Sequence, residues 1–142
     1  MDRYLGLDFG EKRIGVAISD PLGLTAQPLP FVLNDEHSFS KLAALIKDYD
    51  VKVLVLGLPK DREGNDSTKA TEVRDFAAQL NLKTGCSIEF WDERFSTVAV
   101  NRHLIAAGVR RENRKKIVDS QAAMFILQGF MDRLTQKQRD SK

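Results

Sequence analysis

The first third of the chain alternates apolar with small or polar positions, the period of two that strands have. Residues 3–9 place three large apolar side chains on one face and Asp8 with Tyr4 and Gly6 on the other. Residues 12–19 repeat this alternation after a short turn that contains Gly10, which predicts a β-hairpin. Residues 24–33 predict a third strand, which two prolines restrict to a sheet edge or to an irregular course.

Helical and strand-like patterns alternate over the rest of the chain. Apolar residues recur every three or four positions in four segments, which predicts helices over residues 38–48, 68–82, 96–107 and 117–134. A nearly continuous apolar run at 51–58 predicts a strand buried on both faces, and residues 87–91 predict a short last strand. This order predicts an α/β fold with a mixed five-stranded sheet. Its first three strands are antiparallel, its later strands are parallel, and helices cover both faces.

Two polar segments complete the predicted organisation. Residues 108–116 predict a basic loop, because Gly108 ends the preceding helix and charged residues follow it. No internal repeat and no linker divides the chain. Residues 1–136 are therefore predicted to form a single domain, and residues 137–142 a polar tail that frays.

The composition is that of one globular domain, with 142 residues, 42% of them hydrophobic and 30% charged. The formal net charge is only +2, so nucleic-acid binding has to be argued from where the charges lie. A single cysteine, Cys86, excludes an internal disulfide and favours a reducing compartment. There is no apolar signal region and no apolar run near the roughly 20 residues of a membrane span. We therefore expect a cytoplasmic protein with no membrane partner.

Three carboxylates from distant segments stand out as candidate metal ligands. Asp8 lies on the small-residue face of the first strand, and Glu93 follows the last strand, where α/β sheets place binding groups. Asp119 falls within the apolar stripe of the last helix, where a charge is costly unless it is paired or bound to a metal. Two histidines, His37 and His103, and one cysteine cannot form a usual zinc site. Oxygen ligands instead indicate Mg²⁺ or Mn²⁺.

Each carboxylate also has a purely structural interpretation. Asp8 can be a satisfied structural residue of its strand, and Asp92, Glu93 and Arg94 can form a solvated entry to a helix. Asp119 can lie in a first helical turn and pair with the preceding basic segment. Taken together, however, three carboxylates without histidine or cysteine are typical of a cluster that assists phosphoryl displacement with one or two ions.

Basic residues lie close in sequence to these acids. One segment next to Asp119 is rich in arginine and lysine and contains Arg110, Arg111, Arg114, Lys115 and Lys116. Lys12 and Arg13 follow Asp8, and Lys60 and Arg62 follow the buried strand. Basic side chains beside a metal site are well placed to bind a phosphate backbone, although a solvated basic loop is a common alternative. The absence of an aromatic ladder argues against sequence-specific reading of single strands.

Four motifs in order resemble the YqgF/RuvX family over nearly the whole chain. They are Gly6–Asp20 (GLDFGEKRIGVAISD), Gly57–Pro59 (GLP), Asp92–Thr97 (DERFST) and Val118–Ala123 (VDSQAA). Members of this family are described as ribonuclease H-like, as Holliday-junction resolvases and as nucleases that mature the 5′ end of pre-16S ribosomal RNA. The resemblance implies that Asp8, Glu93 and Asp119 are the catalytic carboxylates. It also implies roles for Lys12, Arg13 and Arg94 near the substrate or the acidic cluster.

One departure separates the chain from resolvases of the RuvC type, which are similar in fold and use four carboxylates. The positions after Asp119 are Ser120, Gln121 and Ala122, so no second acid follows. This weakens junction resolution more than it weakens nuclease activity. The favoured function is therefore a metal-dependent endonuclease for pre-16S rRNA, with an rRNA precursor and the ribosome as partners, and junction DNA as the alternative substrate.

Two further hypotheses remain. A fragment of an actin-like ATPase would share the hairpin with Asp8, Gly10 and Gly15, but 142 residues leave no room for the second domain it needs. A catalytically inactive module that binds RNA or the ribosome would keep the fold without cleavage, and the intact acidic positions argue against it. We expect a monomer or a weak homodimer.

Overall fold

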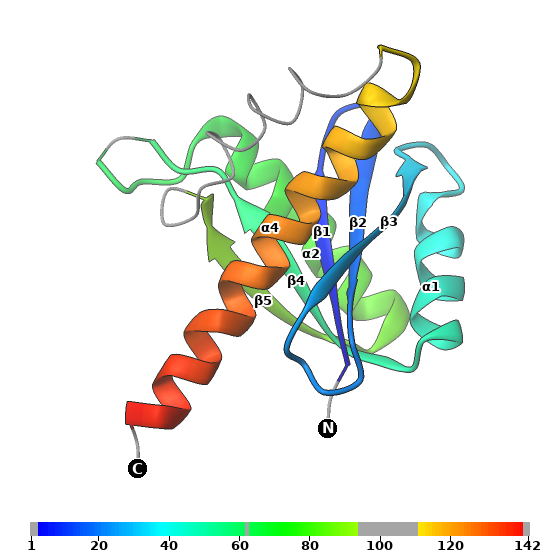
Figure 1. Ribbon diagram of the computed structural model, residues 1–142. Helices are drawn as coiled ribbons and strands as arrows, with labels where there is room; N and C mark the ends of the chain where they lie inside the picture. Colours follow the sequence, from blue (N-terminus) through cyan, green and yellow to red (C-terminus); the bar gives the residue numbers. More distant parts are fainter. Residues whose placement is uncertain (1–2, 62, 94–110, 141–142) are drawn as a thin grey trace.

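The computed structural model describes residues 3–61, 63–93 and 111–140, and in the last of these segments it describes the side chains of residues 121–138. Its elements are, in chain order, β1 (Arg3–Phe9), β2 (Arg13–Ser19), β3 (Ala26–Leu33), α1 (Ser38–Asp48), β4 (Val51–Leu58), α2 (Thr68–Thr84), β5 (Ser87–Asp92) and α4 (Arg111–Asp140) (Figure 1). The predicted strands and the first two helices are confirmed to within two residues at each end. The predicted helix at 96–107 lies outside the described residues.

The strands form one mixed sheet in the order β3-β2-β1-β4-β5. β1 pairs antiparallel with β2, and β2 pairs antiparallel with β3. β4 pairs parallel with β1 on one side and with β5 on the other. This confirms the predicted topology, including the edge position of the proline-containing strand β3. Because β1, β4 and β5 are parallel, their carboxyl ends meet at one edge of the sheet.

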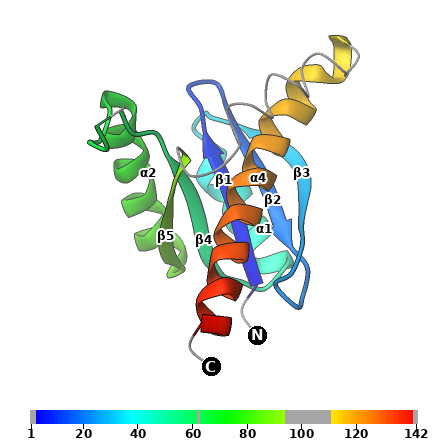
Figure 2. The ribbon, with the colours of Figure 1, turned by 60° about the vertical axis from the view of Figure 1, so that its left-hand side comes forward.

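A helical layer covers each face of the sheet. The long helix α4 crosses one face, while α1 and α2 lie on the other (Figures 1 and 2). The core under α1 and α2 contains the inward residues predicted for the second helix, namely Val73, Phe76, Ala77 and Leu80. The core under α4 contains its small residues Ala122 and Ala123 together with Ile126, Leu127 and Met131. The two helical layers bury β4 on both faces, which explains its nearly continuous run of apolar residues.

The basic segment before Asp119 is helical, which corrects two sequence predictions. Residues 111–116 form the first turns of α4, although a loop was predicted over 108–116, and the same helix runs to Asp140 through the predicted tail. The hydrophobic pattern gave no sign of either extension, because both ends of this helix are polar. They are nevertheless rich in Arg, Lys, Glu and Gln, which are good helix formers, and contain no Gly or Pro.

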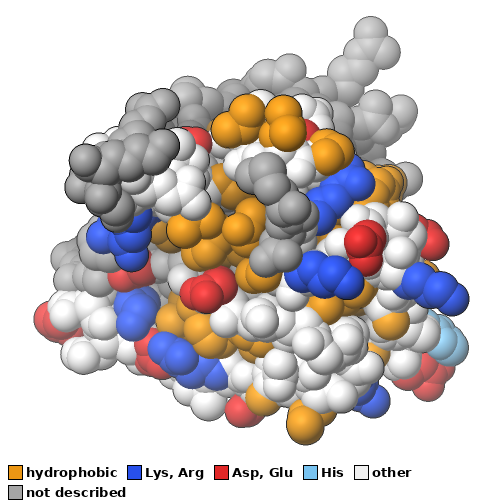
Figure 3. Space-filling model, turned by 90° about the horizontal axis from the view of Figure 1, so that it is seen from below, with side chains coloured by type: hydrophobic (Ala, Val, Ile, Leu, Met, Phe, Trp, Pro, Cys, Tyr) orange, Lys and Arg blue, Asp and Glu red, His pale blue; other side chains and the backbone are white. Residues whose placement is uncertain are grey.

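The end of α4 packs beside the turn between β2 and β3. Gln128 holds this turn to the helix, since its Oε1 accepts a hydrogen bond from Ala26 N at 2.9 Å and its Nε2 donates to Leu24 O at 2.9 Å. Leu22 and Leu24 are 59% and 56% exposed. Seen from below, this side of the molecule carries hydrophobic groups between charged ones (Figure 3). No helix in the described ranges is both long and apolar enough to cross a membrane.

Candidate active site

Asp8 lies near the carboxyl end of the central strand β1, opposite Gly15 of β2. Its side chain is half-buried. Alternation along a strand puts Asp8 on the same face as Gly6. Gly6 faces α4, because a Cβ at this position would lie 2.7 Å from Leu127 Cβ and 2.9 Å from the Ala123 carbonyl oxygen. Asp8 therefore belongs to the face of the sheet that α4 covers.

Glu93 directly follows β5, and its carboxylate extends back over the neighbouring strand. A Cβ on Gly57 of β4 would lie only 2.7 Å from Glu93 Oε1 and 2.5 Å from Ile126 Cδ1. Real Cβ atoms do not approach other atoms so closely, so a side chain at position 57 would make the Glu93 carboxylate and the end of the Ile126 side chain move. Gly57 thus leaves the space that the Glu93 carboxylate occupies between the sheet and α4.

Asp8 and Glu93 come together across β4. Leu7 pairs with Leu56, and one further step of this parallel register brings Asp8 level with Gly57. Neighbouring strands are about 4.8 Å apart. The carboxylate of Glu93, lying over Gly57, is therefore about one strand spacing from β1 at the position of Asp8. The structure brings these two predicted site residues together on one face and at one edge of the sheet.

Helix α4 runs antiparallel to β1 over this face. The Tyr4 ring meets the Phe130 ring with centroids 5.8 Å apart, while Gly6, two residues later, faces Ala123 and Leu127. Moving along β1 toward Asp8 therefore corresponds to moving along α4 toward its N-terminus (Figure 1). Asp119 lies on α4 four residues before Ala123, but its side chain is outside the described part of the structure.

The other predicted basic site residues divide into two groups. Lys12 is exposed on the β1–β2 turn, and Arg13 is half-buried with its guanidinium 5.5 Å from the centre of the Phe31 ring. Arg94 and Arg110 fall outside the described residues. The side chains of Arg111, Arg114, Lys115 and Lys116 are not described either, although their backbone forms the start of α4.

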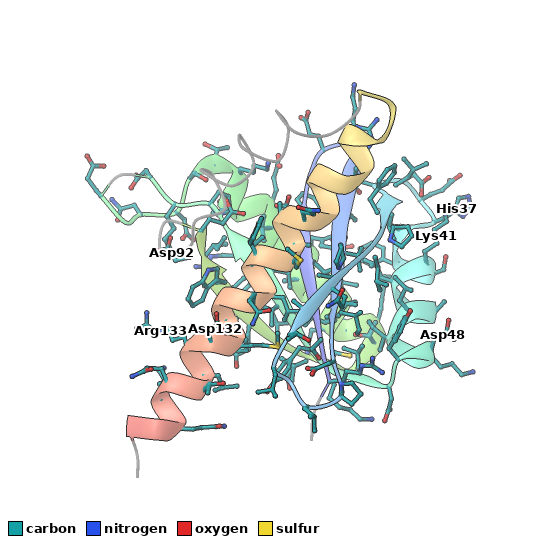
Figure 4. All side chains as sticks on the ribbon, in the orientation of Figure 1. His37, Lys41, Asp48, Asp92, Asp132 and Arg133 are labelled. Carbon is teal, nitrogen blue, oxygen red and sulfur yellow. The ribbon has the colours of Figure 1, made fainter. Side chains whose placement is uncertain are left out.

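The chemistry of the described donors fits a hard cation better than zinc. Asp8 and Glu93 supply carboxylate oxygens, whereas His37 is exposed at α1, where its Nε2 lies 3.4 Å from Glu36 Oε1 (Figure 4). Cys86 is buried, with its thiol 3.6 Å from the Val51 carbonyl oxygen near the opposite ends of the strands. Within residues 3–61, 63–93 and 121–138, no three acidic, His or Cys side chains are grouped to hold a metal. A set of three would thus need a ligand from outside these residues, and Asp119 is the one that the sequence predicts.

A network of three charged residues fixes the segment after β4, and sequence reasoning missed it. Asp66 accepts a hydrogen bond from Arg74 Nε and lies 3.2 Å from Lys60 Nζ. The hydrogen bond from Arg74 and the charge of Lys60 lower the pKa of the Asp66 carboxyl, and the same pairing raises that of Arg74. Lys60, expected to face a polyanion freely, therefore has its charge partly compensated. The spacing of Asp66 and Arg74, eight residues apart, gave no signal of this pairing.

The five-stranded mixed sheet between two helical layers defines an α/β protein of the ribonuclease H-like class. Two solved structures of Holliday-junction resolvases share this fold. RuvC of T. thermophilus in complex with a Holliday junction aligns over 95% of this chain and 97% of its own, with a TM-score of 0.58 at 10% identity. The fowlpox virus resolvase in complex with Holliday-junction DNA aligns over 93% and 98%, with a TM-score of 0.56 at 14% identity.

The chain belongs to the RuvX family. The family described as "RuvX: Holliday junction resolvase" matches residues 2–133. A protein of Lachnospira eligens named "Putative pre-16S rRNA nuclease" is 42% identical over 92% of this chain and 96% of its own length. A protein of Halalkalibacterium halodurans with the same name is 44% identical over the same shares. The resemblance inferred from the four motifs is thereby confirmed.

Proposed function

We propose that this protein is a metal-dependent endonuclease that matures the 5′ end of pre-16S rRNA in the cytoplasm. The observation that carries this proposal is the position of the Glu93 carboxylate over Gly57, level with Asp8 of the central strand. Two acids more than 80 residues apart in the sequence lie at the same edge of the sheet, next to a glycine that leaves space for one of them. Two carboxylates on one face and at one edge of the sheet supply oxygen donors of the kind that a hard divalent cation prefers.

The geometry of α4 supports Asp119 as the third ligand. Gly6 and Asp8 are separated by about 6.7 Å along the strand, and four residues of helix span about 6 Å. Since α4 runs antiparallel to β1 and Ala123 faces Gly6, these rises would bring position 119 close to the level of Asp8. An acid at this position of the covering helix would close the cluster formed by Asp8 and Glu93.

Asp8, Glu93 and Asp119 would hold Mg²⁺ or Mn²⁺ through carboxylate oxygens, the ligands that these cations prefer. When bound, such a cation polarises the attacking water and neutralises charge that develops on the phosphate. The chain's own basic residues would orient the substrate. Lys12 on the turn after Asp8 and Arg13 at the start of β2, together with Arg94 and the first turns of α4, would bind phosphates of the strand being cut.

The names of the relatives support rRNA as substrate, since proteins of matching length and more than 40% identity are described as pre-16S rRNA nucleases. Such a substrate would be met on or near the ribosome by a monomer or a weak homodimer. Junction DNA is the second candidate, which the family description and the fold of the two resolvases favour. The lack of an acid at Ser120, Gln121 and Ala122 disfavours it.

A parallel digestion tests the proposal. Purified protein and its Asp8→Asn variant are incubated with a pre-16S rRNA fragment and with four-way DNA, each with Mg²⁺ and with chelator. We expect the wild type to cut the RNA at the 5′ maturation site only with Mg²⁺, and the variant to bind the RNA without cutting it. Preferential cutting of the DNA junction would select the second candidate. Cleavage that persists in Asp8→Asn would refute the site.

A further inference from the structure

Asn34, the residue that directly follows β3, holds the turn after Asp8 in place with two hydrogen bonds. Asn34 Nδ2 donates a hydrogen bond to the Gly10 carbonyl oxygen at 2.7 Å, and Asn34 N donates to the Lys12 carbonyl oxygen at 2.9 Å. One residue therefore holds both ends of the short turn Gly10–Lys12. This turn joins β1 to β2 at the same edge of the sheet as Asp8 and Glu93.

The conformation of the turn is fixed from within as well. A Cβ on Gly10 would lie 2.5 Å from the Arg13 carbonyl oxygen, so the chain closes tightly at this point and only glycine fits. Beyond the turn, the Arg13 guanidinium lies 5.5 Å from the centre of the Phe31 ring on β3. Lys12 is thus exposed on a turn whose backbone is held on both sides.

We infer that Asn34 is a positioning residue for substrate binding: it fixes the Gly10–Lys12 turn so that Lys12 meets a backbone phosphate next to the Asp8–Glu93 site. This inference rests on the proposed function, because it takes a nucleic-acid strand as the ligand. Asn34 does not itself contact the phosphate in this arrangement. Its hydrogen bonds restrict the turn before the nucleic-acid strand binds. Less conformational entropy is then lost on binding, which favours affinity.

Binding measurements with Asn34→Ala, Lys12→Gln and the double variant test the inference. All are made in the Asp8→Asn background, so that the RNA is bound but not cut. We expect Asn34→Ala to weaken binding about threefold to tenfold, the range of one hydrogen bond. The double variant should bind no more weakly than Lys12→Gln alone, because Asn34 acts through Lys12. Additive losses would overturn the inference.

The salt dependence of RNA binding gives a second measurement. It would not change if Asn34 only stabilised the fold. Lys12→Gln should lower the slope of log K against log salt by up to about one, since one phosphate contact is lost. Asn34→Ala removes no charge, yet it should lower the slope in the same direction because the Lys12 contact becomes less populated. An unchanged slope in Asn34→Ala would contradict the inference.

Asn81 offers a matched control. Its Nδ2 donates to the Cys86 carbonyl oxygen at 2.8 Å, the same kind of bond at the start of β5, away from the carboxyl edge. Asn81→Ala should lower thermal stability about as much as Asn34→Ala while leaving RNA affinity and salt slope at wild-type values. Asn34→Ser keeps the backbone bond and adds no charge, but its shorter side chain does not reach Gly10 as the amide does, so it replaces the alanine variant if that variant unfolds, with the same expected changes.

The outcomes separate this inference from the proposed function. If the wild type bound RNA but showed no Mg²⁺-dependent cleavage, the nuclease activity would be refuted. The binding measurements on Asn34→Ala would still decide whether Asn34 positions Lys12. Cleavage together with additive effects of Asn34 and Lys12 would refute only the positioning role. If the wild-type protein bound no RNA even at low salt, both proposals would fall.

Discussion

The Glu93 carboxylate lies over Gly57, with its Oε1 only 2.7 Å from the place where any other residue would have its Cβ. This relationship joins the end of β5 to the carboxyl end of β4, on the face that α4 covers, and makes a glycine of β4 part of the candidate site. Gly57 contributes no ligand, but a side chain there would push against the Glu93 carboxylate. The effect of removing it can be separated from a general loss of packing.

Gly57→Ala should reduce cleavage at least tenfold, because the added methyl group displaces the Glu93 carboxylate. It should also destabilise the protein by about 1–3 kcal/mol, the usual cost of an extra methyl group in a packed core. The latter cost comes largely from Ile126, whose Cδ1 lies 2.5 Å from the Cβ position. Single-turnover cleavage and thermal unfolding measure the two effects.

The double variant Gly57→Ala with Ile126→Val separates the two effects. Valine removes the Cδ1 atom, so much of the lost stability should return, while the conflict with Glu93 Oε1 remains and cleavage stays low. Ile126→Val alone serves as control and should cleave like the wild type. Recovery of cleavage in step with stability would show that the contact between residues 57 and 93 has no functional role.

The sequence predicts most of this fold because local patterns and topology agree. Alternation identifies β1 and β2, and the continuous apolar run identifies β4, which is buried on both faces. The start of α4 at Arg111 was missed because that segment is polar on all sides, and hydrophobic periodicity carries no information there. Helix propensity would have been the better guide to it.

The candidate site could be predicted only in part, for a different reason. Asp8 and Glu93 stand out by their places at strand ends, and their nearness follows from the sheet order. The requirement for Gly57 depends on a contact between a side chain after β5 and the backbone of β4. The bond from Asn34 to Gly10 likewise depends on how the end of β3 meets a turn. Such contacts arise from tertiary register, which no local pattern contains.

The stability of the folded protein at low pH should depend on Asp66, which lies in the segment after β4. Its pKa is lowered in the folded state by the hydrogen bond from Arg74, so its contribution to stability is present above the unfolded pKa and is lost as pH falls through the folded value. Asp66→Asn should lower the melting temperature at pH 7. The difference from wild type should shrink below about pH 4, near the ordinary pKa of an aspartate. A difference that stays constant from pH 7 to pH 2.5 would contradict this assignment.

Neutralising Arg110, Arg111 and Lys115 together should weaken nucleic-acid binding and flatten its salt dependence. Because Arg111 and Lys115 begin a helix, glutamine is the suitable replacement, since it preserves helix propensity. Loss of up to three phosphate contacts would lower the salt slope by about two to three. Circular dichroism confirms that the helix is retained. A wild-type slope in the triple variant would exclude this segment from the binding surface.

Glu93→Gln should abolish Mg²⁺-dependent cleavage while RNA binding in Mg²⁺-free buffer remains close to wild type. Glutamine keeps the shape of the side chain over Gly57 but removes the negative charge that would bind the cation. Glu89→Gln is the matched control, because Glu89 is an exposed glutamate of β5, four residues before Glu93. Calorimetric titration with Mg²⁺ should show at least tenfold weaker binding for Glu93→Gln, in the range found when metal-site residues are replaced. Equal Mg²⁺ affinities for the two variants would show that Glu93 is not a ligand of the cation. The space that Gly57 leaves for the Glu93 carboxylate would then have no role in metal binding.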